Sequence, residues 1–409
     1  YKKDHVLRVF KAVKELISRG EINNAAVVRS AGVAARVAQM CFGNKLGFEF
    51  TSRLSGKELF KPYYGAFIIE LKGDAKDGEN VIGKTISDYK ILCLDYTVSL
   101  DNLQRIWEGK LEPVFPCRIK TTDTTPQTYS SSNRIQLSAS AKIAKPRVLI
   151  PVFPGTNCEY DTARAFEKAG AKPEVVVIRN LSAGDIEESV SYFERAVRRS
   201  EIIMIPGGFS GGDEPEGSGK FITAFFRNPK IKDAVHDLLK NRDGLMLGIC
   251  NGFQALIKLG LVPYGEIIDM ADDAPTLTFN TINRHQSMMV NTRIASNKSP
   301  WLYGCQVGDI HTVPISHGEG RFVAPASLIQ QLANNGQIAT QYVDLNGNPT
   351  MDIRYNPNTS IEAIEGITSP DGRVFGKMGH SERKGSYICK NVQGEKDQKI
   401  FESGVKYFT

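Results

Sequence analysis

The feature that most constrains the fold of this 409-residue chain is an alternation of apolar runs and helical patterns between residues 147 and 249. Each run is continuously apolar, as in strands that are buried on both faces. Helices are predicted between the runs, at 160–169, 186–197 and 231–240. The apolar runs are RVLIPV (147–152), EVVVIR (174–179), EIIMIP (201–206) and GLMLGI (244–249). This order predicts an α/β domain with a mostly parallel sheet flanked by helices.

The rest of the chain has different patterns. After residue 285, the segments SMMVNTRI, RFVAP and QIATQYV predict further strands, which we expect to be antiparallel additions to the core. Before residue 121, the spacing of apolar residues predicts a smaller α+β lobe. Its predicted helices cover residues 4–19 and 31–40, and its predicted strands cover 64–71 and 89–94.

A boundary is visible at residues 121–145, which are rich in Ser and Thr and poor in large apolar side chains. This is a linker composition. We therefore predict a lobe at 1–120, a linker at 121–145 and the α/β domain at 146–409. No apolar run is long enough to span a bilayer, so we expect no membrane partner.

Cysteine usage and charge narrow the functional classes. The seven cysteines are scattered and never form a CxxC pair, which disfavours a disulfide framework or a metal site and favours a reducing, cytoplasmic compartment. The formal net charge of +6 is concentrated before residue 146. That basic portion could meet a phosphorylated ligand or an acidic partner, with an ordinary solvated surface as the alternative. We expect no nucleic-acid partner.

The stretch GICNG carries the clearest chemical signal. It resembles the G-x-S-x-G nucleophile elbow with Cys250 in place of serine, at the tip of the predicted strand 244–249. A tight strand-to-helix turn would expose the sulfur at the amino end of the next helix, where partial positive charge favours a thiolate. The backbone N–H of Asn251 could then bind an oxyanion. The alternative is a buried structural cysteine.

A thiolate used in acyl transfer needs a base, usually a histidine that is held by a third group. Of the six histidines, His380 stands two residues before Glu382, and residues i and i+2 of an extended segment point to the same side. We therefore expect Cys250, His380 and Glu382 to form a triad. The alternative for the H-x-E pair is an exposed polar loop. His236, in AVHDLLK, is expected to be structural.

Two glycine-containing loops follow predicted strands. In PGGFSGGDEPEG, Gly207 or Gly208 could supply a second oxyanion donor, although the loop could also be only a flexible surface segment. PGTNCEYD lacks the glycine patterns of phosphate-binding loops. We expect Asn157 and Asp161 in that loop to serve as turn and capping residues.

Together, the PGG loop, GICNGFQ and the H-x-E pair resemble the class I, triad-type glutamine amidotransferases. FPGTNCEYD, PGGFSGGD, CNGFQ and PISHGEGRF resemble, more finely, the glutaminase portion of the formylglycinamide ribonucleotide amidotransferases, also called phosphoribosylformylglycinamidine synthases. That resemblance covers 146–409. Before the linker, MCFGNKLGFEF and LFKPYYGAFIIEL resemble the last, aminoimidazole ribonucleotide synthetase-like lobe of that family's synthetase region. The resemblance implies the C-terminal part of a single-chain enzyme.

The resemblance also implies an activity: a ligase that forms a C–N bond with glutamine as amido donor. Cys250 would form a thioester with glutamine, and His380, oriented by Glu382, would protonate the departing ammonia and then activate water. The residues that it implies around the glutamine substrate are Gln254, His317, Gly318 and Glu319. The ammonia would serve the ATP-dependent conversion of formylglycinamide ribonucleotide to formylglycinamidine ribonucleotide in purine biosynthesis.

The implied cofactors and partner lie outside the glutaminase domain. The resemblance implies no cofactor in that domain, ATP and Mg²⁺ in the synthetase region of the full-length enzyme, and the remaining synthetase portion as partner. Two stretches depart from the family: AAVVRSAGVAAR stands where many members have H-D-x-S-D-G-G, and Gln286 stands where a glutamate is usual.

Two other interpretations stay open at this stage. The chain could be a cysteine hydrolase of the related α/β class that acts on a peptide or a small amide. It could also be an inactive or regulatory docking module that uses the basic lobe as its interaction surface. Hydrolysis of glutamine that depends on Cys250 would distinguish a glutamine amidotransferase from both of these alternatives.

Overall fold

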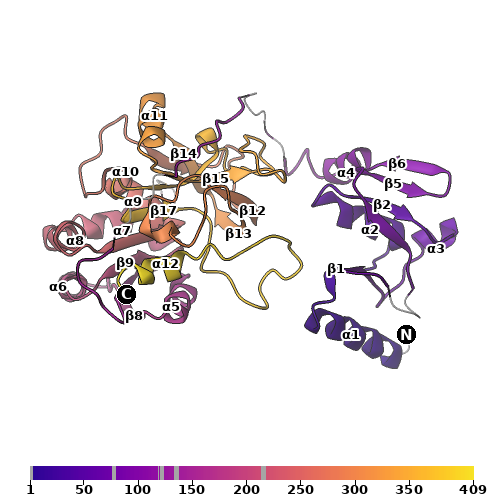
Figure 1. Ribbon diagram of the computed structural model, residues 1–409, viewed down its shortest axis with the longest axis horizontal. Helices are drawn as coiled ribbons and strands as arrows, with labels where there is room; N and C mark the ends of the chain where they lie inside the picture. Colours follow the sequence, from indigo (N-terminus) through magenta and orange to yellow (C-terminus); the bar gives the residue numbers. More distant parts are fainter. Residues whose placement is uncertain (1–2, 76–79, 118, 120–123, 133–137, 213–217) are drawn as a thin grey trace. The chain divides into compact units, whose positions relative to one another are not determined.

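The computed structural model describes residues 3–75, 80–117, 119, 124–132, 138–212 and 218–409 (Figure 1). The chain divides into two compact units. The first contains Tyr1–Cys117 and Cys389–Gln393, and the second contains Arg118–Ile388 and Gly394–Thr409. In the described part of the chain, no helix combines the length and the apolar character that crossing a membrane requires.

The first unit is an α+β lobe. Its larger sheet has the order β4-β2-β5-β6, and β1 pairs with β3 in a separate antiparallel sheet. Helix α2 packs against α3, α4 and β2, and buries Val37 and Cys41 in a small core. The elements are α1 (Lys3–Ser18), β1 (Ile22–Val27), α2 (Gly32–Phe42), β2 (Gly47–Phe50), α3 (Gly56–Phe60), β3 (Phe67–Leu71), β4 (Gly83–Ile86), β5 (Lys90–Cys93), β6 (Tyr96–Ser99) and α4 (Leu100–Gly109).

The second unit begins with the predicted alternation of strands and helices. Runs of Val, Ile and Leu become strands, and those at 202–205 and 245–249 are buried on both faces as predicted. The strand at 172–177 lies at the edge of the sheet, so Val175 and Val177 are exposed there. The elements are β7 (Arg147–Val152), α5 (Glu159–Lys168), β8 (Lys172–Val177), α6 (Ala183–Arg198), β9 (Ile202–Ile205), α7 (Lys220–Phe226), α8 (Pro229–Asn241), β10 (Leu245–Ile249) and α9 (Asn251–Leu259). The mixed α/β fold is therefore confirmed.

Further strands extend this core. Their bounds and those of the accompanying helices are α10 (Leu261–Tyr264), β11 (Thr276–Phe279), β12 (Gln286–Ile294), β13 (Ile310–His317), β14 (Glu319–Val323), α11 (Ala326–Asn334), β15 (Ile338–Val343), β16 (Ile364–Thr368), β17 (Val374–Lys377) and α12 (Ile400–Lys406). Within the described residues they complete a nine-stranded sheet of order β13-β12-β15-β16-β17-β10-β9-β7-β8. The strands β17, β10, β9, β7 and β8 are mutually parallel, and the other pairings are antiparallel.

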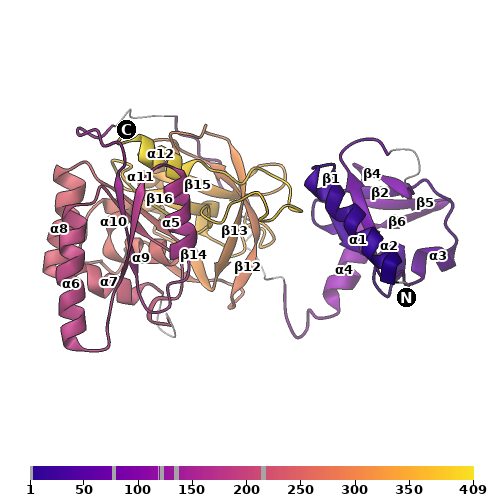
Figure 2. The ribbon, with the colours of Figure 1, turned by 90° about the horizontal axis from the view of Figure 1, so that it is seen from below.

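The strand order explains which helices share a face. The chain steps from β7 outward to β8, and then back across β7 to β9 and β10. Right-handed crossovers therefore send α5 to one face and α6 and α8 to the other. Figure 2 shows α6 and α8 side by side, whereas α5 packs with α12 through the rings of Phe166 and Phe401. The reversal between β7 and β9 is the point where open α/β sheets bind ligands.

One predicted strand lies elsewhere. The run RFVAP forms part of β14, which pairs antiparallel with β11 in a separate two-stranded sheet and does not join the core sheet. The segments that contain SMMVNTRI and QIATQYV do join it, as β12 and β15, in the predicted antiparallel sense. An alternation of apolar residues predicts a strand, but it does not predict which other strand will form hydrogen bonds with its backbone.

The segment 121–145, predicted as a linker, is held against the second unit where the structure describes it. Ser131 N donates to Ala295 O at 2.8 Å, Ala139 N donates to Tyr407 O at 3.1 Å, and Ile143 N donates to Phe408 O at 2.9 Å. Residues 121–123 and 133–137 lie outside the described residues. Small polar side chains leave the backbone free to pair, so composition alone does not separate a linker from a polar segment that runs along a surface.

Candidate active site

The turn between β10 and α9 holds Cys250 in a strained conformation. Its φ of 54° and ψ of −107° are unfavourable for a residue with a β-carbon, as expected at a nucleophile elbow. Backbone hydrogen bonds fix it on both sides: Cys250 N donates to Lys377 O at 2.9 Å, and Gln254 N donates to Cys250 O at 3.0 Å. The turn thus places the sulfur at the carboxyl edge of the parallel strands and at the amino end of α9.

The two glycines that flank the elbow are required by packing. A methyl group at Gly252 would lie 2.0 Å from the carbonyl oxygen of Ile205, and one at Gly248 would lie 2.6 Å from Cδ1 of Leu256. Strand β10 and helix α9 therefore approach their neighbours more closely than any side chain allows. The turn can form only if both positions are glycine, which explains the G-x-C-x-G spacing around Cys250.

His380 and Glu382 form a buried pair just after β17. His380 Nδ1 lies 2.6 Å from Glu382 Oε1, and His380 N donates to Pro314 O at 2.8 Å. Both side chains are almost fully buried. His380 Nε2 is buried and has no hydrogen-bond partner among the described residues. The pair has the geometry of an imidazole that is oriented by a carboxylate, with its second nitrogen left for another group.

Gly207 lies between Cys250 and the His380 imidazole. A methyl group there would lie 2.7 Å from Cε1 of His380, 3.1 Å from Sγ of Cys158 and 3.4 Å from Cβ of Cys250. The structure thus brings the three residues of the expected triad to one place, although they come from β10–α9 and from the segment after β17. Gly207 follows β9, so the neighbouring strands β9, β10 and β17 together position the group.

The electrostatics of the pair favour a charged imidazole. Burial alone would lower the pKa of His380, but Glu382, Cys250 and Cys158 raise it well above its ordinary value. Burial alone would raise the pKa of Glu382, but the imidazole beside it lowers that pKa. An imidazolium between a carboxylate and a sulfur is therefore the preferred state, and an imidazolium stabilises a neighbouring thiolate.

Sequence reasoning missed the second sulfur at this site. Cys158 lies at the start of α5, and Arg383 Nη2 donates to its Sγ at 3.1 Å. Its Sγ is 3.9 Å from His380 Nδ1. The position of PGTNCEYD in the sequence could have predicted this sulfur. The stretch follows β7, so it lies at the same edge of the sheet as the loops after β9 and β10.

Within the described residues, one group could hold a metal ion. Ligand atoms of Cys158, His380 and Glu382 lie within 4.8 Å of one another. Two of the three are already joined by the 2.6 Å hydrogen bond, and the Arg383 guanidinium touches the third. A cation here would compete with both contacts, so the donor set suits proton transfer better than metal binding.

The predicted oxyanion residues line the same edge. Gly208 has a φ of 151°, and a methyl group there would lie 2.7 Å from Gly155 O. The side chain of Asn251 ties this loop to α9, because its Oδ1 accepts from Ser210 N at 3.2 Å and its Nδ2 donates to Gln254 Oε1 at 2.9 Å. Gly207 is packed against the imidazole and Cβ of Cys250, whereas Gly208 packs against the loop after β7.

The four predicted substrate residues lie close to the first turn of α9. The Gln254 amide Nε2 donates to Glu319 O, and the Glu319 carboxylate accepts from Ser218 N at 2.9 Å. Gly318 O accepts from Asn280 N at 2.9 Å. A methyl group at Gly320 would lie 2.3 Å from the His317 ring. The Gln254, His317 and Glu319 side chains are buried, and the Gln254 amide is engaged by protein groups.

His317 follows Ser316, whose carbonyl oxygen faces the Cys250 sulfur, and its surroundings favour the neutral imidazole. Burial, together with the charges of His380 and His285, lowers its pKa to about 3. Asn358 Nδ2 lies 3.2 Å from its Nε2, and its buried Nδ1 has no partner among the described residues. The adjacent Ser316 carbonyl oxygen lies 3.7 Å from Sγ of Cys250. His317 can therefore hydrogen-bond a ligand near the sulfur, but it is poorly suited to serve as the base.

Comparison with known proteins gives consistent matches. The family model for the CobB/CobQ-like glutamine amidotransferase domain matches residues 145–408. The chain is 39% identical over 244 residues to phosphoribosylformylglycinamidine synthase subunit PurQ of Methanococcus maripaludis strain S2, covering 58% of this chain and 82% of that relative. It is 31% identical over 243 residues to the Aquifex aeolicus subunit, covering 59% and 93%. A solved structure of PurLQS from Thermotoga maritima aligns with a TM-score of 0.47 and 27% identity, covering 65% and 100%.

Proposed function

We propose, on the premise that this chain belongs to the CobB/CobQ-like glutamine amidotransferase family together with the PurQ subunits, that it hydrolyses glutamine through a thioester on Cys250. The released ammonia would serve the synthesis of formylglycinamidine ribonucleotide. The observation that carries this proposal is the convergence of strained Cys250 and the buried His380–Glu382 pair around Gly207.

The reaction begins with attack by the Cys250 sulfur on the side-chain amide carbon of glutamine. A C–S bond forms, and the amide oxygen becomes an oxyanion that the backbone N–H groups of Asn251 and of Gly207 or Gly208 stabilise. His380 gives its proton to the amide nitrogen, the C–N bond breaks, and ammonia leaves. The imidazolium favoured by Glu382 is the state from which this proton can be given.

The second half restores the enzyme. Neutral His380 takes a proton from water, which attacks the thioester carbon; the C–S bond breaks and glutamate leaves. Glu382 holds the imidazole so that Nδ1 stays bonded and Nε2 performs both transfers. Gln254, His317, Gly318 and Glu319 would orient the glutamine.

The ammonia would be used outside this domain. We infer that the chain is the C-terminal part of a single-chain amidotransferase, in which 1–120 is the last lobe of the synthetase region. The partner would be the remaining synthetase portion, where ATP and Mg²⁺ support the amidation of formylglycinamide ribonucleotide. The relatives are named as subunits of phosphoribosylformylglycinamidine synthase, which supports a synthetase as the partner.

The test is a glutaminase assay of the wild type, Cys250→Ala and a control variant. We expect Cys250→Ala to lower glutamate release by about 10³-fold or more, as when a covalent nucleophile is removed. The control is Cys117→Ala, because Cys117 is exposed and lies in the first unit. Glutamate release by Cys250→Ala at the wild-type rate would refute the proposal.

A further inference from the structure

A buried ion pair lies behind the turn that carries His380. Lys377, the last residue of β17, and Glu365, in the adjacent antiparallel strand β16, place Nζ and Oε1 3.3 Å apart. Both side chains have an exposed fraction of 0%. Desolvating two charges costs more than their mutual attraction returns unless further hydrogen bonds satisfy them, so the partners of this pair matter.

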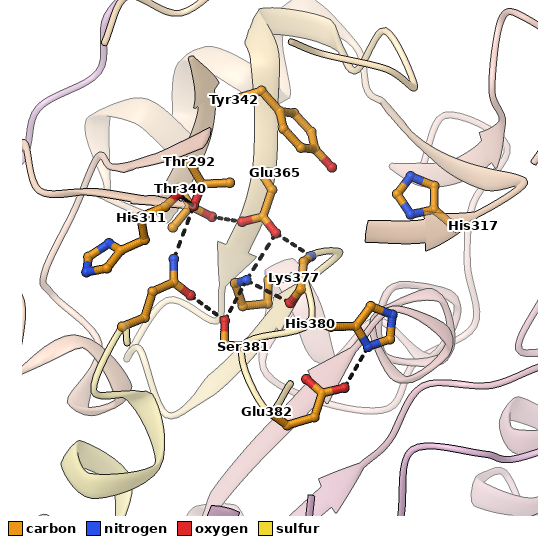
Figure 3. A network of polar contacts seen from close by, with 12 residues as sticks. Thr292, His311, His317, Thr340, Tyr342, Glu365, Lys377, His380, Ser381 and Glu382 are labelled. Carbon is orange, nitrogen blue, oxygen red and sulfur yellow. Dashed lines mark hydrogen bonds and ion pairs between the residues drawn. The ribbon is translucent and has the colours of Figure 1, made fainter. Parts of the chain in front are cut away.

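Those partners are the residues on either side of His380. Lys377 Nζ donates to Gly379 O at 2.8 Å and to Ser381 Oγ at 3.0 Å. Glu365 Oε1 accepts from Gly379 N at 2.6 Å. Figure 3 shows the two charged groups on one side of the turn, and the His380 and Glu382 side chains together beyond it. Both charges therefore hold the Gly379 backbone before the imidazole, and Lys377 also holds the Ser381 hydroxyl after it.

A second layer holds the pair and the turn in place. Glu365 Oε2 accepts from Thr340 Oγ1, and Ser381 Oγ donates to Gln398 Oε1. Gln398 Nε2 donates in turn to Thr292 Oγ1 at 3.2 Å (Figure 3). Every polar atom of the ion pair thus has a partner, and those partners are anchored to β12, β15 and the segment before α12. A network that is fully satisfied is rigid.

The turn packs tightly against these charges. A methyl group at Gly379 would lie 3.0 Å from both Glu365 Oε1 and Lys377 Nζ, and 2.6 Å from Cγ2 of Val313. His380 itself is tied through its N–H to Pro314 O. Within the described residues, neither charged side chain of the pair is hydrogen-bonded or ion-paired to a member of the proposed triad, so their influence on the site passes through the backbone.

We propose that Lys377 and Glu365 are positioning residues for the glutaminase reaction: their buried ion pair holds the Gly379–Ser381 turn so that the His380 imidazole faces Cys250. A hydrophobic pair of similar size would fill the same space without the cost of desolvating two charges. We therefore attribute the presence of the charges to the directed hydrogen bonds that they make with the turn. This inference rests on the proposed function, since it takes His380 as the base.

The test uses the double variant Lys377→Met/Glu365→Gln, because either single change would leave one buried charge without its partner. The amide oxygen introduced at position 365 would still accept from Gly379 N, but the ammonium that holds Gly379 O and Ser381 Oγ is lost. We expect the kcat for glutamine hydrolysis to fall about 10²-fold, as for a misplacement on the scale of an ångström, while KM stays within about three-fold. KM should change little because the residues proposed to orient glutamine, such as Gln254 and Glu319, lie on α9 and β14 and not on the turn.

The matched control is Arg373→Met, which breaks an ion pair with Asp371 and Asp243 just before the other end of β17. We expect it to affect thermal stability without changing kcat. A double variant whose kcat equals that of the control, whatever its melting temperature, would overturn the inference, because a purely structural pair changes stability alone.

A third variant keeps the inference testable if the double variant does not fold. Ser381→Ala removes the hydroxyl between Lys377 and Gln398 without exposing a charge, and we expect a fall in kcat of about ten-fold with KM unchanged. An unchanged kcat would count against the inference. Failure of the proposed function is distinguishable, since it appears as glutamine hydrolysis that survives Cys250→Ala in the otherwise wild-type chain.

Discussion

His285, His317 and His380 differ in the charge that they can carry, and this difference supports the role proposed for His380. Burial lowers the pKa of His285 and of His317, whereas Glu382 and the neighbouring sulfurs raise that of His380 above its ordinary value against the effect of burial. Only His380 of these three is then suited to hold a proton at neutral pH and to pass it on. The neutral pair can bind a ligand without competing for that proton.

This assignment predicts the behaviour of Glu382→Gln. Without the carboxylate, His380 loses its proton at lower pH, so the basic limb of the kcat/KM profile should move from well above 6.5 toward lower pH. We expect kcat to fall about 10²-fold, the scale of general acid–base catalysis. Glutaminase rates measured across pH check both effects. Glu395→Gln, a change at an exposed carboxylate, serves as the control, and an unmoved basic limb in Glu382→Gln would contradict the prediction.

At the scale of elements, loops after neighbouring parallel strands build the site by close approach. The loop after β9 brings Gly207 against His380, Cys158 and Cys250, with no room for a side chain. The loop after β7 brings Cys158, and the turn after β10 brings Cys250. The geometry of the proposed site therefore depends on how tightly these loops pack as well as on the identity of Cys250 and His380.

We predict that Gly207→Ala lowers kcat by about 10²-fold, because the added methyl group would meet Cε1 of His380 at 2.7 Å and displace the imidazole. Gly184→Ala is the matched control: it lies in the first turn of α6, where the nearest atom would be 3.9 Å away. Glutaminase kinetics and thermal unfolding of both variants test this. Equal kcat values for the two variants would show that the contact is not needed for catalysis.

Local patterns predicted part of these elements and missed others. Strand β10 and the elbow could be predicted because a continuous apolar run and a glycine on each side of Cys250 are properties of neighbouring residues. Strands β16 and β17 were missed, since IEGIT and VFGK contain glycine and the charged residues of the buried pair. Glu365 and Lys377 can be buried because they form an ion pair with each other. A single sequence does not reveal that these two residues are in contact, so it does not predict their burial.

At the scale of the whole molecule, access to the site becomes the question. Cys250 and His380 are nearly fully buried, and the Gln254 amide is engaged by Asn251 and Glu319. On the proposed function, entry of glutamine would require these groups to open or to exchange hydrogen-bond partners. A site that is closed in this way can be gated by the part of the enzyme that consumes its product.

We predict that this chain alone hydrolyses glutamine slowly and that adding the remaining synthetase portion with formylglycinamide ribonucleotide and ATP accelerates it by about ten-fold or more, the range of coupling between sites. Glutamate release with and without that portion is the measurement, and Cys250→Ala serves as the blank. Equal rates in the two mixtures would contradict the prediction.

Strand β13 contacts both halves of the chemistry. It forms one edge of the described nine-stranded sheet, its Pro314 carbonyl oxygen holds the His380 N–H, and its Ser316 carbonyl oxygen faces the Cys250 sulfur. Because both contacts come from one edge strand, any change in the position of β13 would alter the hold on the His380 backbone and the surroundings of the Cys250 sulfur together.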